Sequence, residues 1–133
     1  MEEDNPIERL YMENKKLPHN HCEEDNHPES FCDVLSRTED FERISNIFKQ
    51  MGDPTRIRIF WLLCHCEECV INIAAIMDMS SPAVSHHLRM LKNTGLINSR
   101  REGKEVFYSA AKTPIAQLLH EMIEQVMQIT CPD

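Results

Sequence analysis

The sequence predicts a small, mainly helical domain that carries one β-hairpin. The strongest evidence is the segment from Ser80 to Ser109, where an amphipathic helix is followed by a glycine and by two β-type runs that flank a basic turn. Two helices with clear start signals precede this segment, and an apolar helix follows it. Helices in this order, completed by a hairpin, predict a winged helix-turn-helix fold.

The first two expected helices are separated by a glycine. The first covers Glu39 to Gln50 and places four apolar residues on one face, which predicts a core helix: Phe41, Ile44, Ile47 and Phe48. Gly52 ends it. Asp53 is a favourable N-cap and Pro54 suits the first helical position, so a second helix should run from there to about Cys64.

Two further helices form the predicted helix-turn-helix. The first of them is short, and its apolar stripe consists of Val70, Ile73, Ala74 and Met77. After a tight turn, Ser81 is the expected N-cap and Pro82 the first residue of the second helix, which Gly95 should end. Its buried positions are Val84, Leu88 and Leu91. The residues on its outward face are Ser81, Ser85, His86, Arg89 and Lys92.

The predicted hairpin, or wing, follows this helix. Residues 96–99 should form its first strand and residues 106–108 its second, with a basic turn made of Arg100, Arg101, Gly103 and Lys104. The last helix, residues 114–128, has more apolar residues than one small domain can cover: Ile115, Leu118, Leu119, Met122, Ile123, Val126 and Met127. We therefore expect it to form a homodimer contact.

Length and charge divide the chain into three parts. A chain of 133 residues can bury one core, which we assign to residues 39–128, between an acidic arm at residues 1–38 and a tail at 129–133. The formal net charge is −8, but residues 1–42 carry thirteen acidic side chains against four basic ones. Residues 80–112 carry six basic side chains against two acidic ones. The local charge of the helix and wing therefore favours binding to phosphate.

The composition also indicates a compartment. The acidic N-terminus is followed by no apolar run, and no segment approaches the roughly 20 apolar residues of a membrane span. We therefore expect a cytoplasmic protein. In that reducing compartment, six cysteines are metal ligands or redox thiols more readily than a disulfide framework.

The outward face of the fourth helix and the wing predict contacts to double-stranded DNA. The expected contact residues are Ser81, Ser85, His86, Arg89, Lys92, Arg100, Arg101 and Lys104. His87 lies one step round the helix and is left out of this set. The alternative interpretation is a polar face that is merely hydrated.

Soft metal ligands gather at the junction of the second and third helices. Cys64, Cys66 and Cys69 lie there beside His65, and the arm adds His19, His21, Cys22, His27 and Cys32 on acidic spacers. Thiolates at such spacing bind Zn²⁺, Cd²⁺, Pb²⁺, Cu⁺ or trivalent arsenic. Two alternatives stay open: the cysteines are small buried hydrophobes and the arm an inert tail, or they form a disulfide with the arm in a redox or sulfur-species sensor.

Three motifs in order resemble the ArsR/SmtB family of metal-sensing repressors. They are GDPTRIRI at 52–59, AVSHHLRMLKNTGLI at 83–97 and REGKEVFY at 101–108. The resemblance covers about residues 41–128 and implies a homodimer of winged-helix domains that blocks a promoter until an inducer binds. It also implies that the helix at 81–94 enters the major groove and that the wing follows the DNA backbone.

The resemblance extends to the metal ligands. The chain is similar to the thiolate-rich members, in which cysteines at the start of the third helix join cysteines of the N-terminal arm. The usual run there is Cys-Val-Cys-Asp, whereas Ile71 and Asn72 follow Val70 here, so a second sulfur must come from Cys66 or Cys64. Other members bind harder ions across the last helix. This chain departs from their pattern and keeps only His120 and Glu124 on that helix.

The sequence therefore predicts a repressor that releases operator DNA when a transition or soft metal ion binds. A thiol-based sensor on the same fold is the main alternative, and a metal-binding module whose winged helix binds protein is a weaker one. No nucleophile–base set or phosphate-binding glycine loop is found, and only three glycines are present, so we expect no enzyme.

Overall fold

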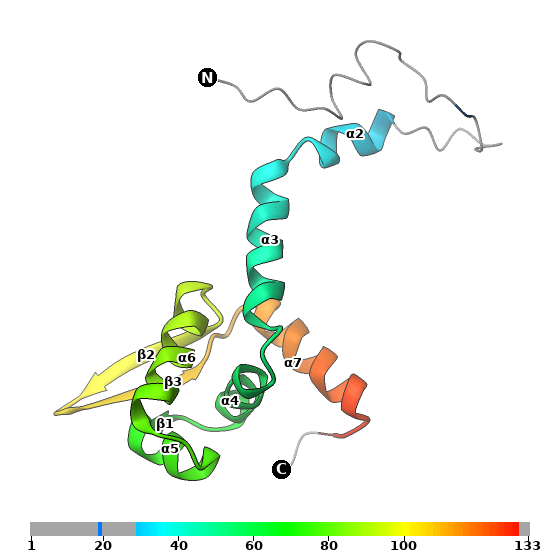
Figure 1. The fold of residues 1–133 in the computed structure, drawn as a ribbon. Coiled ribbons are helices and arrows are strands. Elements are labelled where there is room, and N and C mark those ends of the chain that lie inside the picture. Colours follow the sequence, from blue (N-terminus) through cyan, green and yellow to red (C-terminus); the bar gives the residue numbers. More distant parts are fainter. Residues whose placement is uncertain (1–18, 20–28, 131–133) are drawn as a thin grey trace. The chain divides into compact units, whose positions relative to one another are not determined.

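The structure is a computed structural model that describes residue 19 and residues 29–130 (Figure 1). The predicted arm ligands His21, Cys22 and His27 lie outside the described residues. The chain divides into two compact units, residues 1–45 and 46–133. Helix α2 (Glu29–Leu35) belongs to the first unit, and α3 (Thr38–Gln50) crosses from the first into the second.

The second unit holds a helical core with a three-stranded antiparallel sheet of order β1-β3-β2. Its elements after α3 are α4 (Pro54–His65), β1 (Glu68–Cys69), α5 (Val70–Met77), α6 (Ser81–Asn93), β2 (Ile97–Glu102), β3 (Glu105–Ala110) and α7 (Pro114–Met127). The largest fully buried side chains are Phe60, Ile59, Ile73, Leu88, Leu91, Leu96, Ile97 and Val84. The core thus joins α4, α5 and α6 to the base of the hairpin, and the predicted winged helix-turn-helix is confirmed.

Local signals set the helix boundaries. The Asp53 side chain accepts a hydrogen bond of 3.0 Å from the Arg56 amide, which caps α4 as predicted. The predicted cap of α6 is wrong by one residue, because the Ser80 hydroxyl, not that of Ser81, accepts from the Ala83 amide at 3.3 Å. Either serine has the required chemistry. Only the backbone path from the preceding turn selects Ser80.

The end of α6 follows the prediction closely. Gly95 has a φ of +76° after the C-cap, and its amide donates to the Lys92 carbonyl at 3.0 Å. The Leu96 amide donates to the Leu91 carbonyl at 3.2 Å, which completes a Schellman motif. Leu96 and Ile97 are then buried, so the chain enters the wing from the core.

The wing is longer than predicted. Arg100 and Arg101 belong to β2, where they pair with Phe107 and Val106 of β3. The turn contains only Gly103 and Lys104, and Gly103 has a φ of +62°, as the first central residue of a type II′ turn requires. The prediction of a four-position turn is therefore wrong, since a two-residue turn lets both arginines extend the ladder.

Strand β1 was not predicted. Its two residues pair with β3, with Glu68 opposite Tyr108 and Cys69 opposite Phe107. Two residues between helices carry no detectable alternation, so no sequence pattern could identify this strand. It fixes the start of α5 to the wing.

Two helices carry apolar faces that stay exposed in the described part of the chain. No residue of α3 is buried, and Phe48 is 60% exposed. The prediction that the apolar face of α3 packs in a single-chain core is therefore wrong. Of the four apolar residues predicted on that face, Ile47 alone packs against the core. Helix α7 buries Ala116, Leu119 and Ile123. Its second apolar face is exposed and consists of Ile115, Leu118, Met122 and Val126. Helical periodicity identifies such a face but not the surface that covers it.

Candidate nucleic-acid interface and metal ligands

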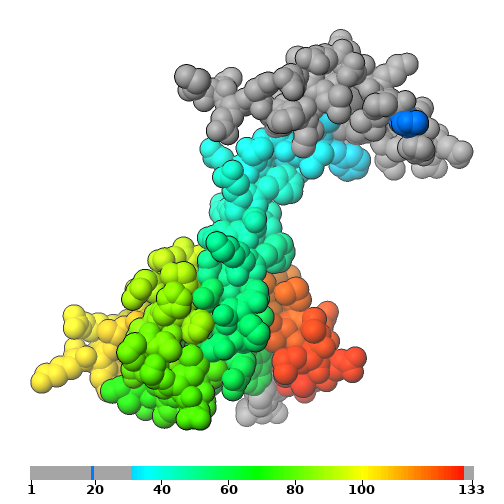
Figure 2. Space-filling view, in the orientation of Figure 1, coloured from blue at the N-terminus to red at the C-terminus, as the bar shows by residue number. Residues whose placement is uncertain are grey.

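The wing projects from the second unit beside the surface that holds α6 (Figure 2), and the outward face of α6 is polar. Ser81, His86, Arg89 and Lys92 are exposed on it, and Ser85 is half-buried. The opposite face is anchored, because Val84, Leu88 and Leu91 are at most 1% exposed. A helix held this firmly by its apolar side can offer its polar side to a groove without losing its place in the core.

The side chain of His87 holds α6 against α4. Its Nδ1 lies 3.3 Å from Arg56 Nε, and the buried Arg56 guanidinium also donates to the Gln50 side chain. Burial is the main cause that lowers the pKa of His87, which favours the neutral ring that accepts from arginine. His87 is therefore a packing residue in this structure.

The three wing cations differ in their surroundings. Arg100 Nε donates to Glu67 Oε1 at 2.8 Å, its Nη1 donates to Glu102 Oε2 at 2.7 Å, and its guanidinium lies 4.9 Å from the centre of the Phe107 ring. The same contact lowers the pKa of the Glu67 carboxyl. In the described part of the chain, Arg101 and Lys104 have no carboxylate within 4.0 Å and are exposed.

One contact joins the helix to the wing. Lys92 Nζ donates to the Ser99 hydroxyl at 2.5 Å, from the last turn of α6 to the middle of β2. Helix face and wing therefore form one basic surface. This surface, defined by Ser81, Ser85, His86, Arg89, Lys92, Arg101 and Lys104, is called the basic face below.

The predicted thiol ligands occupy different environments. Cys66 is half-buried, its thiol donates to the Leu62 carbonyl at 3.4 Å, and burial raises its pKa. Cys69 is 8% exposed, ends β1 and occupies the N-cap position of α5 without a side-chain capping hydrogen bond. Cys64 is half-buried and lines a cavity of about 390 Å³ with Cys66. Among the described residues, no group of three or more metal-ligating atoms includes these cysteines.

The predicted arm ligands all belong to residues 1–45, the first unit, and only two of them are described. Cys32 is half-buried in α2, and His19 is exposed. His21 and Cys22 lie outside the described residues. The thiolate site therefore stays a prediction.

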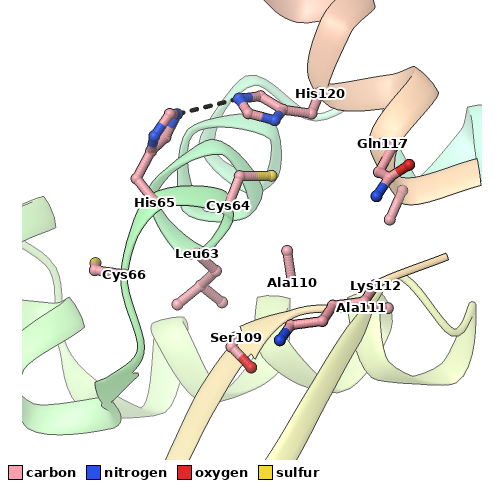
Figure 3. Close-up of a pocket in the computed structure, with 11 residues that line it drawn as sticks. Leu63, Cys64, His65, Cys66, Ser109, Ala110, Ala111, Lys112, Gln117 and His120 are labelled. Atoms are coloured by element: carbon pink, nitrogen blue, oxygen red, sulfur yellow. Dashed lines mark hydrogen bonds between the residues drawn. The ribbon is translucent and has the colours of Figure 1, made fainter. Parts of the chain in front are cut away.

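A different ligand group does converge, and its convergence was not predicted. His65 at the end of α4 and His120 and Glu124 on α7 place their ligand atoms within 4.8 Å of one another. Figure 3 shows the two rings facing across the gap between the helices. The spacing of His120 and Glu124 was visible in the sequence, but nothing in it places the end of α4 against α7.

Comparison with known proteins places this fold and these motifs. The family described as "Bacterial regulatory protein, arsR family" matches residues 53–99. The chain is 34% identical over 87 residues to a transcriptional repressor SmtB homolog from Synechocystis sp., which covers 65% of this chain and 66% of that protein. It is 39% identical over 79 residues to a cadmium resistance transcriptional regulatory protein CadC homolog from Staphylococcus aureus, over 59% of this chain and 65% of that protein. The match thus spans slightly less than two thirds of each relative.

A solved structure agrees in fold. The homodimeric winged helix-turn-helix DNA-binding domain of a possible ArsR-family regulator from Mycobacterium bovis superimposes with a TM-score of 0.64 at 27% identity, over 69% of this chain and 84% of that one. Every helix within residues 29–130 is too short or too polar to span a lipid bilayer.

Proposed function

We propose that this chain, which belongs to the arsR family of bacterial regulatory proteins, is a homodimeric, DNA-binding transcriptional repressor whose repression is relieved by a metal ion. Membership of this family also confirms the expectation of a regulator and not an enzyme. The observation that carries this proposal is the basic face, in which the exposed side of α6 lies next to Arg101 and Lys104, the exposed cations of the wing.

The basic face suits duplex DNA in two ways. Helix α6 supplies Arg89 and Lys92, which reach guanine edges or phosphates, and His86 and the serines, which donate to either. The wing supplies Arg101 and Lys104 at its outer part, where a backbone would run beside the groove. Phosphate attraction depends on this local surface and not on the net charge of −8.

The exposed face of α7 favours a homodimer. Ile115, Leu118, Met122 and Val126 recur every three or four residues and are exposed by 47% or more. An apolar stripe at this spacing packs well against its own copy across a two-fold axis. Two copies of α6 would then face successive major grooves, about 34 Å apart.

The inducer we propose is a soft or transition metal ion. The Staphylococcus relative is named for cadmium resistance. Thiol and imidazole ligands match such ions in chemistry. The candidate ligands are Cys64, Cys66 and Cys69, with Cys22, Cys32, His19 and His21 of the arm. A bound ion would supply bonds that hold these side chains together.

The fold connects Cys69 directly to the basic face. Cys69 lies in β1, opposite Phe107 of the wing, and starts α5, which packs on α6. Because Cys69 is 8% exposed, it must leave its buried position to bind an ion shared with the arm. That movement would shift both the wing and α6, so the conformation that binds DNA and the conformation that presents Cys69 would compete. Such coupling typically amounts to about 1–3 kcal/mol.

A reporter gene placed behind the DNA upstream of this gene tests the proposal. The parent chain should repress the reporter, and Cd²⁺ or Zn²⁺ should relieve the repression. An Arg89→Ala variant should fail to repress, whereas Arg58→Ala, which changes an exposed arginine of α4 outside the basic face, should repress normally. Equal repression by both variants would contradict the assigned DNA surface.

A further inference from the structure

We propose that His65, His120 and Glu124 form a binding site for a borderline divalent cation such as Zn²⁺, Co²⁺ or Ni²⁺ within each protomer. The site uses nitrogen and oxygen ligands and no thiol. It lies between the end of α4 and the middle of α7 (Figure 3). The proposal does not depend on repressor activity.

The distances between ligand atoms suit one ion. His65 Nε2 and His120 Nε2 are 3.1 Å apart, and Glu124 Oε2 lies 3.3 Å from His120 Nε2 and 3.7 Å from His65 Nε2. An ion with metal–ligand bonds of about 2.0–2.2 Å in tetrahedral geometry separates its ligands by about 3.3–3.6 Å. Changes of a few tenths of an ångström would therefore bring all three atoms to an ion.

The chemistry of the group matches borderline cations. Two imidazoles and one carboxylate are the ligand set of many zinc sites that keep a fourth position open. Imidazole also suits Ni²⁺ and Co²⁺, whereas Cd²⁺ and Cu⁺ favour the thiols. The three side chains are 13–21% exposed, so an ion can enter while the ligands stay ordered by the packing of the two helices.

The surroundings favour a site with an open position. The cavity of about 390 Å³ is lined by His65 and His120, which leaves room for a water ligand next to the ion. On its other side, the His65 ring stacks on Trp61, with ring centres 4.4 Å apart. The two histidines share a hydrogen bond, which metal binding would replace.

The position differs from both predicted kinds of metal site. All three ligands come from one protomer, and the arm takes no part. An ion here would clamp α4 to α7, the helix whose outer face we assign to the dimer contact. His65 also directly precedes Cys66, so the two sites are close along the chain but differ in ligand chemistry.

Trp61 provides the test, because it is the single tryptophan of the chain. Titration of the full-length, reduced, DNA-free Cys66→Ser/Cys69→Ser protein, which lacks two of the thiol ligands, with Ni²⁺ or Co²⁺ should quench its fluorescence to saturation at one ion per protomer. Glu124→Gln and His120→Gln should each weaken this binding by more than about 100-fold. A loss of that size indicates a direct ligand, because removal of a group that only supports a ligand weakens metal binding by at most about 100-fold. Glu121→Gln removes an exposed carboxylate from the same helix and should leave the affinity unchanged.

A second measurement separates this site from the thiols. In a Cys66→Ser/Cys69→Ser variant, bound Co²⁺ should keep its visible absorption but show no thiolate charge-transfer band in the near ultraviolet. Loss of all Co²⁺ binding in that variant would overturn the proposal, as would equal affinities of Glu124→Gln and Glu121→Gln. Because the titration contains no DNA, either result leaves the proposed repressor function intact.

Discussion

The wing offers a quantitative test, since its arginines are adjacent in sequence but differ in their neighbours. Arg100 already lies between the carboxylates of Glu67 and Glu102, whereas Arg101 has none within 4.0 Å among the described residues. An arginine compensated by two carboxylates releases few counterions when DNA binds. We therefore expect Arg101→Ala to weaken the salt dependence of DNA binding and Arg100→Ala to change it little.

The size of the effect follows from the number of phosphates contacted. The slope of log K against log salt is negative, and each lost phosphate contact reduces its magnitude by about 0.9. A dimer has two wings, so Arg101→Ala should lower the slope by about 1.8. Over a fourfold rise in salt, the parent should then lose about tenfold more affinity than the variant.

Fluorescence anisotropy of a labelled duplex, read at several salt concentrations, measures these slopes. The duplex carries the DNA upstream of this gene, and the protein is reduced and metal-free. If Arg100→Ala lowers the slope as much as Arg101→Ala does, the ion pairs with Glu67 and Glu102 do not persist on DNA, and the reasoning fails. Glu67→Gln is the matching control, because it leaves Arg100 with one carboxylate, Glu102, in place of two and should make the salt dependence steeper.

Three further predictions concern stability and assembly. Ser80→Ala should lower the free energy of unfolding in urea by about 1 kcal/mol, because α6 loses its cap. Ser81→Ala should change that free energy by less than about 0.5 kcal/mol. A larger loss for Ser81→Ala than for Ser80→Ala would restore Ser81 as the cap. Met122→Glu should convert the proposed dimer to monomer in sedimentation, whereas Glu121→Gln should not. A dimer that survives Met122→Glu would place the contact elsewhere. The pKa of Asp53 in the folded protein is lowered below 3.8, so its cap stabilises α4 fully above pH 3.8 and is lost as the pH falls through the lower folded-state pKa. Asp53→Asn should therefore flatten the acid limb of a curve of stability against pH. An unchanged acid limb would contradict this.

The sequence could predict those parts of the fold that depend on local signals. Asp53, Pro54 and Gly95 marked helix ends because their conformational preferences act within a few residues. The same locality explains the errors. Ser80 and Ser81 are equivalent as caps until the preceding turn is built, and the length of the wing depends on where the ladder closes at Gly103.

The functional residues divide in the same way. The outward face of α6 follows from helical periodicity, so its exposure could be predicted. The ion pair of Arg100 with Glu67 spans 33 residues, and the contact of His65 with His120 spans 55. Both require the packing of distant elements, which no single-sequence pattern encodes. For that reason the nitrogen and oxygen ligands came together only in the structure.

Release of DNA by metal tests the central claim most directly. Zn²⁺ or Cd²⁺ is added to the reduced dimer bound to the labelled upstream duplex, and anisotropy is followed for the parent and for Cys66→Ser/Cys69→Ser. The account predicts a fall in anisotropy for the parent and a steady value for the variant. Anisotropy that stays constant in both would contradict a metal-relieved repressor and would leave a winged-helix DNA-binding protein with another inducer.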